Sequence, residues 1–261
     1  MRDMSNHIYP LRIGRGNENR SPLFTLYRSI IHPNVRDAVP RNRLPPQRVD
    51  LRSKMPPVYD QGDLDSCTAN AICAIIQYDD PSLQASRMFL YYNERVIEGN
   101  IREDLGTTIA DGIASLNTFG LCPEADWPYD VLLRDTQPPN ECYATATAIS
   151  SNLRIYSLPN SITDMKKALV AGFPIIVGIK VYESFESHAV SCSGMVPVPG
   201  PSEKCFGGHT VVCIGYNDAT SRWILRNSRG PQWGDAGHFY LPYRYLLDPN
   251  LASPLWVITR C

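Results

Sequence analysis

The order of helix-like and strand-like segments restricts the fold of this chain more than any other feature of its sequence. Before Leu153, apolar residues recur at helical spacings in segments that begin at Cys67, Ser86 and Thr108. After Leu153, they gather in short β-branched and aromatic runs between turn residues, which is typical of strands in a mostly antiparallel sheet. Helices that precede strands in this way predict an α+β protein, and we expect two lobes.

The boundaries of these elements follow from local capping and turn signals. Gly120 is expected to end the third helix, and Ser161 with Asp164 forms a capping pattern for a fourth. The predicted helices cover 67–77, 86–97, 108–119 and 161–171, and the predicted strands cover 174–179, 210–216, 223–226 and 238–241.

Composition excludes several broad classes of protein. With 43% apolar and 20% charged residues, the chain of 261 residues resembles a globular protein that can bury its own core. A net charge of −1 argues against a chain that is basic throughout, and we expect no nucleic-acid partner. The longest apolar stretch, 168–179, is broken by Gly172 and Pro174 and is shorter than the ~20 residues that span a bilayer, so we expect no membrane partner.

Residues 1–45 are expected to form an N-terminal extension and not a domain. Prolines interrupt them repeatedly, and they contain one apolar cluster, 23–31. Residues 1–44 hold eight Arg and three Asp or Glu, a net charge of +5, which leaves −6 for the remainder. Opposite charge and an apolar cluster predict a segment that docks onto the rest of the chain. A plain solvated tail is the alternative.

The compartment stays open at this stage. No signal peptide is visible at the N-terminus, because Arg2, Asp3, His7 and Arg12 interrupt any apolar core. Secretion or export to the periplasm is favoured if a signal was removed, and the cytoplasm otherwise. The eight cysteines permit disulfides without requiring them.

A cysteine, a histidine and an asparagine stand at positions that suit nucleophilic catalysis. Cys67 lies in the first turn of a buried helix, where free backbone N–H groups and the helix dipole are expected to lower the pKa of a thiol. His209 enters a strand behind two glycines, and Asn227 follows another strand. A thiolate needs a base that takes and returns its proton, and that base needs a third group to fix its tautomer. These residues are therefore a candidate triad.

The sequence around them resembles the papain-like cysteine peptidases over most of residues 47–245, in particular their compact bacterial and viral branch. The matching stretches, in chain order, are VDLRSKMPPVYDQG, QGDLDSCTANA, FGLCPEADWPYD, GGHTVVCIGY and RNSRGPQWGDAGHFYLPY. His209 lies within the ~130–150 residues downstream of the cysteine that are usual in this family, and Asn227 lies slightly beyond. The resemblance implies a helical L lobe, 46–155, packed on an antiparallel β-barrel R lobe, 156–261, with the active-site cleft between them.

The resemblance also implies roles for individual residues. Cys67 would be the nucleophile, His209 the acid and base, and Asn227 the group that orients the imidazole. Gln61 would donate a side-chain N–H to the oxyanion together with the backbone N–H of Cys67. The implied reaction is the hydrolysis of peptide bonds in proteins or peptides through a thioester, with no cofactor and no metal ion. Residues 1–45 would then be a short inhibitory segment of a zymogen.

Four further residues are expected to contact substrate. Gly106 matches a glycine whose backbone binds the substrate strand, Gly208 directly precedes the base, and Trp233 matches an indole on the leaving-group side. Asp65 stands where the family usually has a glycine at the floor of the S1 subsite, which predicts a preference for a basic residue at P1. The alternative for Asp65 is a helix cap or a solvent-exposed side chain.

The chain also departs from the family pattern. Leu64 replaces the cysteine that begins a disulfide, so the oxyanion loop must be held differently. Arg229 replaces the tryptophan that shields the bond between the base and the asparagine. Among the remaining cysteines, a bridge between Cys122 and Cys142 is the pairing that the resemblance suggests.

Two alternative functions follow from the same residues. The pattern His188, Cys192, Cys205 and His209 has spacings at which thiolates and imidazoles can bind zinc, which would make the protein a binding module and not an enzyme. The same fold and triad could also serve an amidase or an acyl transferase.

Overall fold

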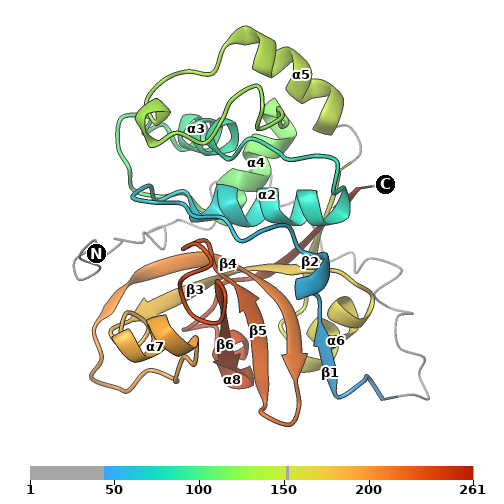
Figure 1. Ribbon diagram of the computed structural model, residues 1–261, viewed down its shortest axis with the longest axis vertical. Coiled ribbons are helices and arrows are strands. Elements are labelled where there is room, and N and C mark those ends of the chain that lie inside the picture. Colours follow the sequence, from blue (N-terminus) through green and yellow to red (C-terminus); the bar gives the residue numbers. More distant parts are fainter. Residues whose placement is uncertain (1–43, 151–152, 261) are drawn as a thin grey trace.

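The structure is a computed structural model that describes residues 44–150 and 153–260 (Figure 1). Most of the helices lie together at the top of Figure 1, and the strands form a sheet below them. This arrangement confirms the α+β architecture with two lobes. The predicted extension, except for residues 44 and 45, lies outside the described residues.

In the described residues, one short strand and then consecutive helices occupy the chain before residue 151, and strands alternate with shorter helices after it. The helices are α2 (Cys67–Asp79), α3 (Arg87–Glu98), α4 (Ile109–Phe119), α5 (Asn140–Ser150), α6 (Ile162–Val170), α7 (His188–Ser193) and α8 (Tyr243–Leu247), with short 3-10 turns at η2 (Arg52–Lys54) and η3 (Val131–Leu133). The strands are β1 (Arg48–Asp50), β2 (Leu153–Leu158), β3 (Ile175–Tyr182), β4 (Cys205–Asn217), β5 (Arg222–Arg226), β6 (His238–Pro242) and β7 (Leu255–Arg260).

The capping signals place the helix starts correctly. Ser86 caps α3 by accepting a hydrogen bond from the N–H of Phe89, and Thr108 forms a capping box with Asp111 at the start of α4. Ser161 caps α6 in the same way. The elements α5, α7, α8, β1, β2 and β7 were not predicted. The first of these, α5, is a run of small and polar residues with little helical periodicity in its apolar positions.

All strand pairs in the sheet are antiparallel, in the order β2-β7-β3-β4-β5-β6, and β1 also pairs with β4. Strand β4 is buried continuously from Gly208 to Tyr216, without the alternation of a strand that has one face in water. The reason is that α2 packs against β4 and β7, so the helical lobe covers this part of the sheet. The contact between α2 and β4 brings the predicted nucleophile and base to one interface.

A glycine on β4 makes room for the N-terminal strand. A side chain at Gly215 would lie 2.3 Å from the backbone oxygen of Val49, so only glycine lets β1 come this close. The register Val49 opposite Tyr216 then fixes the chain before η2 on the sheet. In the part of the chain that the structure describes, no helix combines the length and apolar character needed to cross a bilayer.

Candidate active site

The nucleophile candidate is the first residue of α2. The side chain of Cys67 is buried, with 4% of its surface exposed, and its sulfur accepts the backbone N–H of Thr210 at 3.4 Å. Thr210 follows His209 on β4, so the sulfur lies against the strand that carries the base. The contact joins Cys67 to the neighbour of His209, and the roles of Cys67 and His209 stay a prediction.

The base candidate is oriented by the asparagine. Atom Nε2 of His209 lies 2.7 Å from Oδ1 of Asn227, and both side chains are buried. The same Oδ1 accepts the N–H of Ser228 at 2.9 Å, which identifies it as the amide oxygen. Because an amide oxygen only accepts, His209 must donate from Nε2, and its Nδ1 carries the lone pair.

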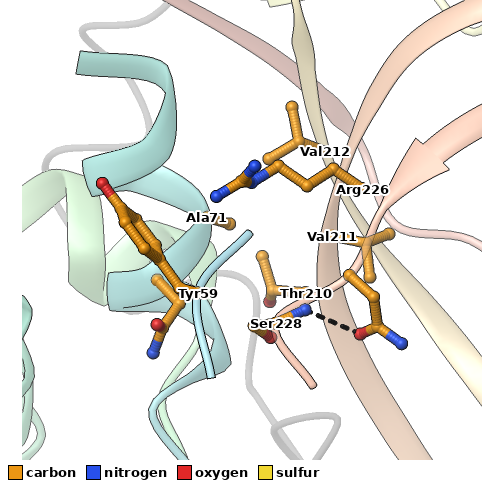
Figure 2. Close-up of a pocket in the computed structure, with 9 residues that line it drawn as sticks. Tyr59, Ala71, Thr210, Val211, Val212, Arg226 and Ser228 are labelled. Atoms are coloured by element: carbon orange, nitrogen blue, oxygen red, sulfur yellow. Dashed lines mark hydrogen bonds between the residues drawn. The ribbon is translucent and has the colours of Figure 1, made fainter. Parts of the chain in front are cut away.

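The interface behind this pair is closely packed. One cavity of about 10 Å³ lies there, which is room for about one water molecule. Its lining residues come from both lobes: Tyr59, Asn70, Ala71, Thr210, Val211, Val212, Arg226, Asn227 and Ser228. Figure 2 shows Tyr59 and Ala71 facing Thr210 and Ser228 across the cavity. Asn227 itself is buried, with 2% of its surface exposed.

Burial controls the protonation of the pair. It raises the pKa of the Cys67 thiol to about 11 and lowers the pKa of the His209 imidazole to about 3. The positive charge of Arg229 adds to the lowering for His209. The lowered thiol pKa predicted from the helix N-terminus is wrong for this arrangement, because the loss of hydration outweighs the helix dipole. Burial therefore favours the uncharged form of each side chain.

Gln61, the predicted oxyanion donor, is held by hydrogen bonds from its side chain and its backbone. Its side chain is buried, with Oε1 accepting the hydroxyl of Ser228 at 2.6 Å and Nε2 donating to the backbone oxygen of Leu64 at 2.7 Å. Its backbone N–H donates to the oxygen of Ser228 at 2.8 Å. The amide nitrogen carries two hydrogens, and the bond to Leu64 uses one of them. The other is available to a developing negative charge.

A tyrosine and an aspartate hold the loop that carries Gln61. The hydroxyl of Tyr129 donates to the backbone oxygen of Gln61 at 2.8 Å and lies 2.6 Å from Oγ of Ser66, directly before the nucleophile. On the other side, Asp104 accepts the N–H of Asp65 at 3.1 Å. These hydrogen bonds act where the family has a disulfide. Sequence reasoning missed both residues, although Tyr129 belongs to the quoted stretch FGLCPEADWPYD.

An aromatic group covers the base although the expected tryptophan is replaced. The ring of Phe185 meets the His209 ring edge to face at 6.4 Å between centroids and stacks on Trp233 at 5.4 Å. The Arg229 guanidinium lies over both Phe185 and Trp233 and forms two bonds of 2.6 Å to the carboxylate of Glu186. Trp233 thus packs on Phe185, and its role on the leaving-group side stays a prediction. Phe185, which the sequence did not single out, is the ring that contacts His209.

The other predicted substrate contacts lie beside the nucleophile. Gly106 has a φ of +71°, and a side chain there would reach within 3.4 Å of the backbone oxygen of Asp65. Gly208 is buried on β4 directly before His209. Burial and the nearby charge of Asp104 raise the pKa of Asp65 to about 7. Asp65 does not act as the cap of α2, since Ser66 is the N-cap residue.

The predicted zinc ligands do not converge. Among the described residues, no group of three or more His, Cys, Asp or Glu side chains could hold a metal ion. The sulfur of Cys192 lies 3.5 Å from Nε2 of His188 on the exposed side of α7, and Cys205 is exposed at the start of β4. His209 is buried against Asn227 instead. The zinc pattern is therefore wrong, because the buried His209 does not join the exposed pair of His188 and Cys192.

The suggested bridge is also absent. Cys122 and Cys142 are free thiols, as are the other cysteines in the described ranges, 44–150 and 153–260. They do share one small buried cluster with Phe89 and Ala146. The prediction placed them correctly as neighbours but wrongly as a disulfide.

Comparisons with known proteins agree with this geometry. Residues 45–245 match the family described as papain family cysteine protease. A peptidase C1-like protein of Acanthamoeba polyphaga mimivirus is 42% identical over 76% of this chain and 68% of its own length. Cysteine proteinase 3 of Entamoeba histolytica is 25% identical over 80% of this chain and 65% of its own length. The chain thus spans about two thirds of the length of these relatives.

Solved structures show the same fold. The crystal structure of xylellain, a cysteine protease from Xylella fastidiosa, has a TM-score of 0.76 and 36% identity, covering 84% of this chain and 87% of its own. Digestive procathepsin L 3 of Tenebrio molitor has a TM-score of 0.64 at 20% identity and covers 91% of this chain and 78% of its own. The family match, the viral relative and the xylellain structure lead to one conclusion: the chain belongs to the papain family of cysteine proteases.

Proposed function

We propose that the protein is an endopeptidase that cleaves peptide bonds through a triad of Cys67, His209 and Asn227. The observation that carries the proposal is the bond from His209 Nε2 to Asn227 Oδ1, 2.7 Å, on a strand whose next N–H donates to the Cys67 sulfur. This arrangement leaves Nδ1 of His209 as the acceptor for the thiol proton. No cofactor enters the reaction.

The reaction proceeds in two halves. The thiol proton passes to Nδ1 of His209, the sulfur attacks the peptide carbonyl, and the oxyanion accepts hydrogen bonds from Gln61 Nε2 and the Cys67 N–H. The C–N bond then breaks, the amine takes the proton from the imidazolium, and a thioester remains. Water attacks the thioester after giving a proton to His209, and the C–S bond breaks to release the acid and restore the thiol.

Selective alkylation tests the triad. With iodoacetamide near neutral pH, followed by peptide mapping, we expect Cys67 to be modified faster than the exposed thiols of Cys192 and Cys205, because His209 accepts the thiol proton while the sulfur attacks the reagent. Replacing His209 with Gln should abolish that advantage and leave the two exposed cysteines unchanged. Equal labelling of all three cysteines in the parent would contradict the triad.

A peptide substrate separates the peptidase from the related amidase or acyl transferase. Cleavage of an internal peptide bond that is lost in Cys67→Ser supports the endopeptidase. Replacing Asn227 with Ala should lower kcat while a residual rate persists, because the imidazole then loses only its orientation. Transfer of the acyl group to an added amine, with no hydrolysis, would favour the acyl transferase.

We further propose that residues 1–45 inhibit the enzyme until they are removed, and that 46–155 and 156–261 form the two lobes around the cleft. The support is the charge of +5 on residues 1–44 against −6 on the remainder. Strand β1 is bound to β4, so a chain that starts at Pro45 keeps its contact with the sheet.

We expect a chain that starts at Pro45 to cleave a protein substrate faster than the full chain. Raising the salt concentration should activate the full chain more, because salt screens the opposite charges. Equal activity of both chains would overturn the proposal.

A further inference from the structure

One arginine at the start of α3 contacts the groups that support the oxyanion loop, residues 60–66. The side chain of Arg87 is largely buried, with 11% of its surface exposed. Its guanidinium carbon lies over the ring of Tyr59, 4.5 Å from the centroid, and over the ring of Tyr129, 4.0 Å from the centroid. The attraction between a cation and an aromatic face is stronger where water is excluded, so these rings hold the guanidinium firmly.

A glutamate fixes the orientation of Arg87 relative to Tyr129. Nη2 of Arg87 donates to Oε1 of Glu124 at 2.9 Å, and the backbone N–H of Arg87 donates to Oε2 at 3.1 Å. The same Oε1 accepts the backbone N–H of Tyr129 at 3.1 Å. The ring contacts and the hydrogen bonds together use the plane and the fork of the guanidinium, which the single ammonium group of a lysine cannot reproduce.

One set of contacts leads from Arg87 to Gln61. The hydroxyl of Tyr129, whose ring lies against Arg87, donates to the backbone oxygen of Gln61 at 2.8 Å. Nη1 of Arg87 donates directly to the backbone oxygen of Asp60, the preceding residue, at 3.5 Å. Arg87 therefore supports the stretch of backbone from which the Gln61 side chain extends.

A second set of contacts leads from Arg87 to the backbone N–H of Cys67. Nη1 of Arg87 also donates to Oδ1 of Asn70 at 3.2 Å, which identifies this atom as the amide oxygen. The amide nitrogen of Asn70 then faces Ser66 and donates to its backbone oxygen at 2.9 Å. The carbonyl of Ser66 and the N–H of Cys67 belong to the same planar peptide unit. Fixing one of them fixes the direction of the other.

We propose that Arg87 is a positioning residue that holds the two oxyanion donors, the side chain of Gln61 and the N–H of Cys67, at a fixed separation. It acts through Tyr129 and Asn70 and takes no part in making or breaking bonds. Donors stabilise a developing charge most when they are already in place before the reaction. This inference rests on the proposed function, because an oxyanion forms only when the thiolate attacks a carbonyl group.

The test compares two reactions of the same thiol in the full-length chain. Hydrolysis of a peptide substrate develops an oxyanion, whereas alkylation by iodoacetamide displaces iodide from a saturated carbon and develops none. Arg87→Lys keeps the positive charge and loses the planar fork. We expect it to lower kcat for hydrolysis about tenfold with little change in KM, less than the ~10²–10³ that follows removal of a donor. The rate of Cys67 alkylation should stay within about twofold of the parent.

Arg222→Lys is the control for the loss of an arginine fork. Nη1 of Arg222 donates to the backbone oxygens of Val196 at 2.8 Å and Tyr240 at 3.0 Å, neither of which belongs to the oxyanion loop. This variant should keep the kcat of the parent. Asn70→Ala is a second variant in case Arg87→Lys does not fold. It removes the side-chain bond to the backbone oxygen of Ser66, and it should also lower kcat without slowing alkylation.

Several results would overturn the inference. Hydrolysis and alkylation that fall by the same factor in Arg87→Lys would indicate a general structural effect. A kcat equal to that of the parent, in Arg87→Lys or in Asn70→Ala, would exclude a role in positioning the donors. An equal loss of kcat in Arg222→Lys would show that any lost arginine fork has this effect. If the parent itself shows no peptide hydrolysis and no alkylation of Cys67 that depends on His209, the proposed function fails instead.

Discussion

Replacing Tyr129 with Phe should weaken both the stability and the catalytic rate of the enzyme. The change deletes one oxygen atom that bridges the backbone oxygen of Gln61 at 2.8 Å and the hydroxyl of Ser66 at 2.6 Å. Each hydrogen bond contributes about 0.5–1.5 kcal/mol net, so the free energy of unfolding should fall by about 1–3 kcal/mol. For a domain of this size, this corresponds to roughly 2–4 °C in Tm for each kcal/mol.

The loss of rate follows from the position of Gln61. Once its backbone is released, its side chain no longer meets the oxyanion at a fixed distance, and kcat should fall about tenfold or more while KM changes little. Urea denaturation gives the stability, and hydrolysis of one peptide substrate gives kcat and KM.

Tyr78→Phe is a matched control. The hydroxyl of Tyr78 also donates to a backbone oxygen, that of Gly172, at 2.8 Å, but it lies at the other end of α2. With one hydrogen bond lost in place of two, its free energy of unfolding should fall by about 0.5–1.5 kcal/mol, and it should keep its kcat. If Tyr129→Phe and Tyr78→Phe had the same kcat, the idea that Tyr129 positions the oxyanion loop would be refuted.

Further outcomes are expected at other positions. Because burial and Asp104 raise the pKa of Asp65 to about 7, its carboxylate forms only above that pH, and the preference in kcat/KM for a basic over an uncharged P1 residue should grow between pH 6 and pH 8. Asp65→Gly should lack this growth, and an identical pH trend in both enzymes would exclude Asp65 from P1 recognition. Replacing Arg229 with Met removes a positive charge that lowers the pKa of His209, so the NMR titration of the imidazole should move to higher pH, and an unmoved titration would contradict this. Peptide mapping without reductant should recover Cys122 and Cys142 as free thiols, whereas a linked peptide would contradict the structure.

Local signals in the sequence are sufficient for the helix starts and for the candidate triad. The caps at Ser86 and Thr108 lie within four residues of the groups that they bind, so the pattern contains the whole interaction. The triad candidates could be found because each stands at a recognisable boundary of a helix or a strand.

Groups that depend on distant contacts could not be predicted in this way. Phe185 covers His209 only because β3 and β4 pair, and Tyr129 reaches Gln61 from a loop far along the chain. The predicted lowering of the Cys67 pKa was wrong for the same reason. The burial that raises this pKa comes from packing between the lobes, which the residues next to Cys67 in the sequence do not indicate. The positions of Cys67 and His209 can thus be predicted from the sequence, but their protonation states cannot.

The order of strands in the sheet has a consequence for how the protein is made. Strand β7 lies between β2 and β3, although the ribosome synthesises it after every other strand of the described sheet. A nascent chain can form α2 early from local contacts, but α2 packs on β7 as well as on β4, so its interface with the sheet is incomplete until β7 has emerged and joined β2 to β3. We expect the growing polypeptide to remain unable to cut itself or its neighbours during translation, because proteolytic competence begins only when the sheet is complete.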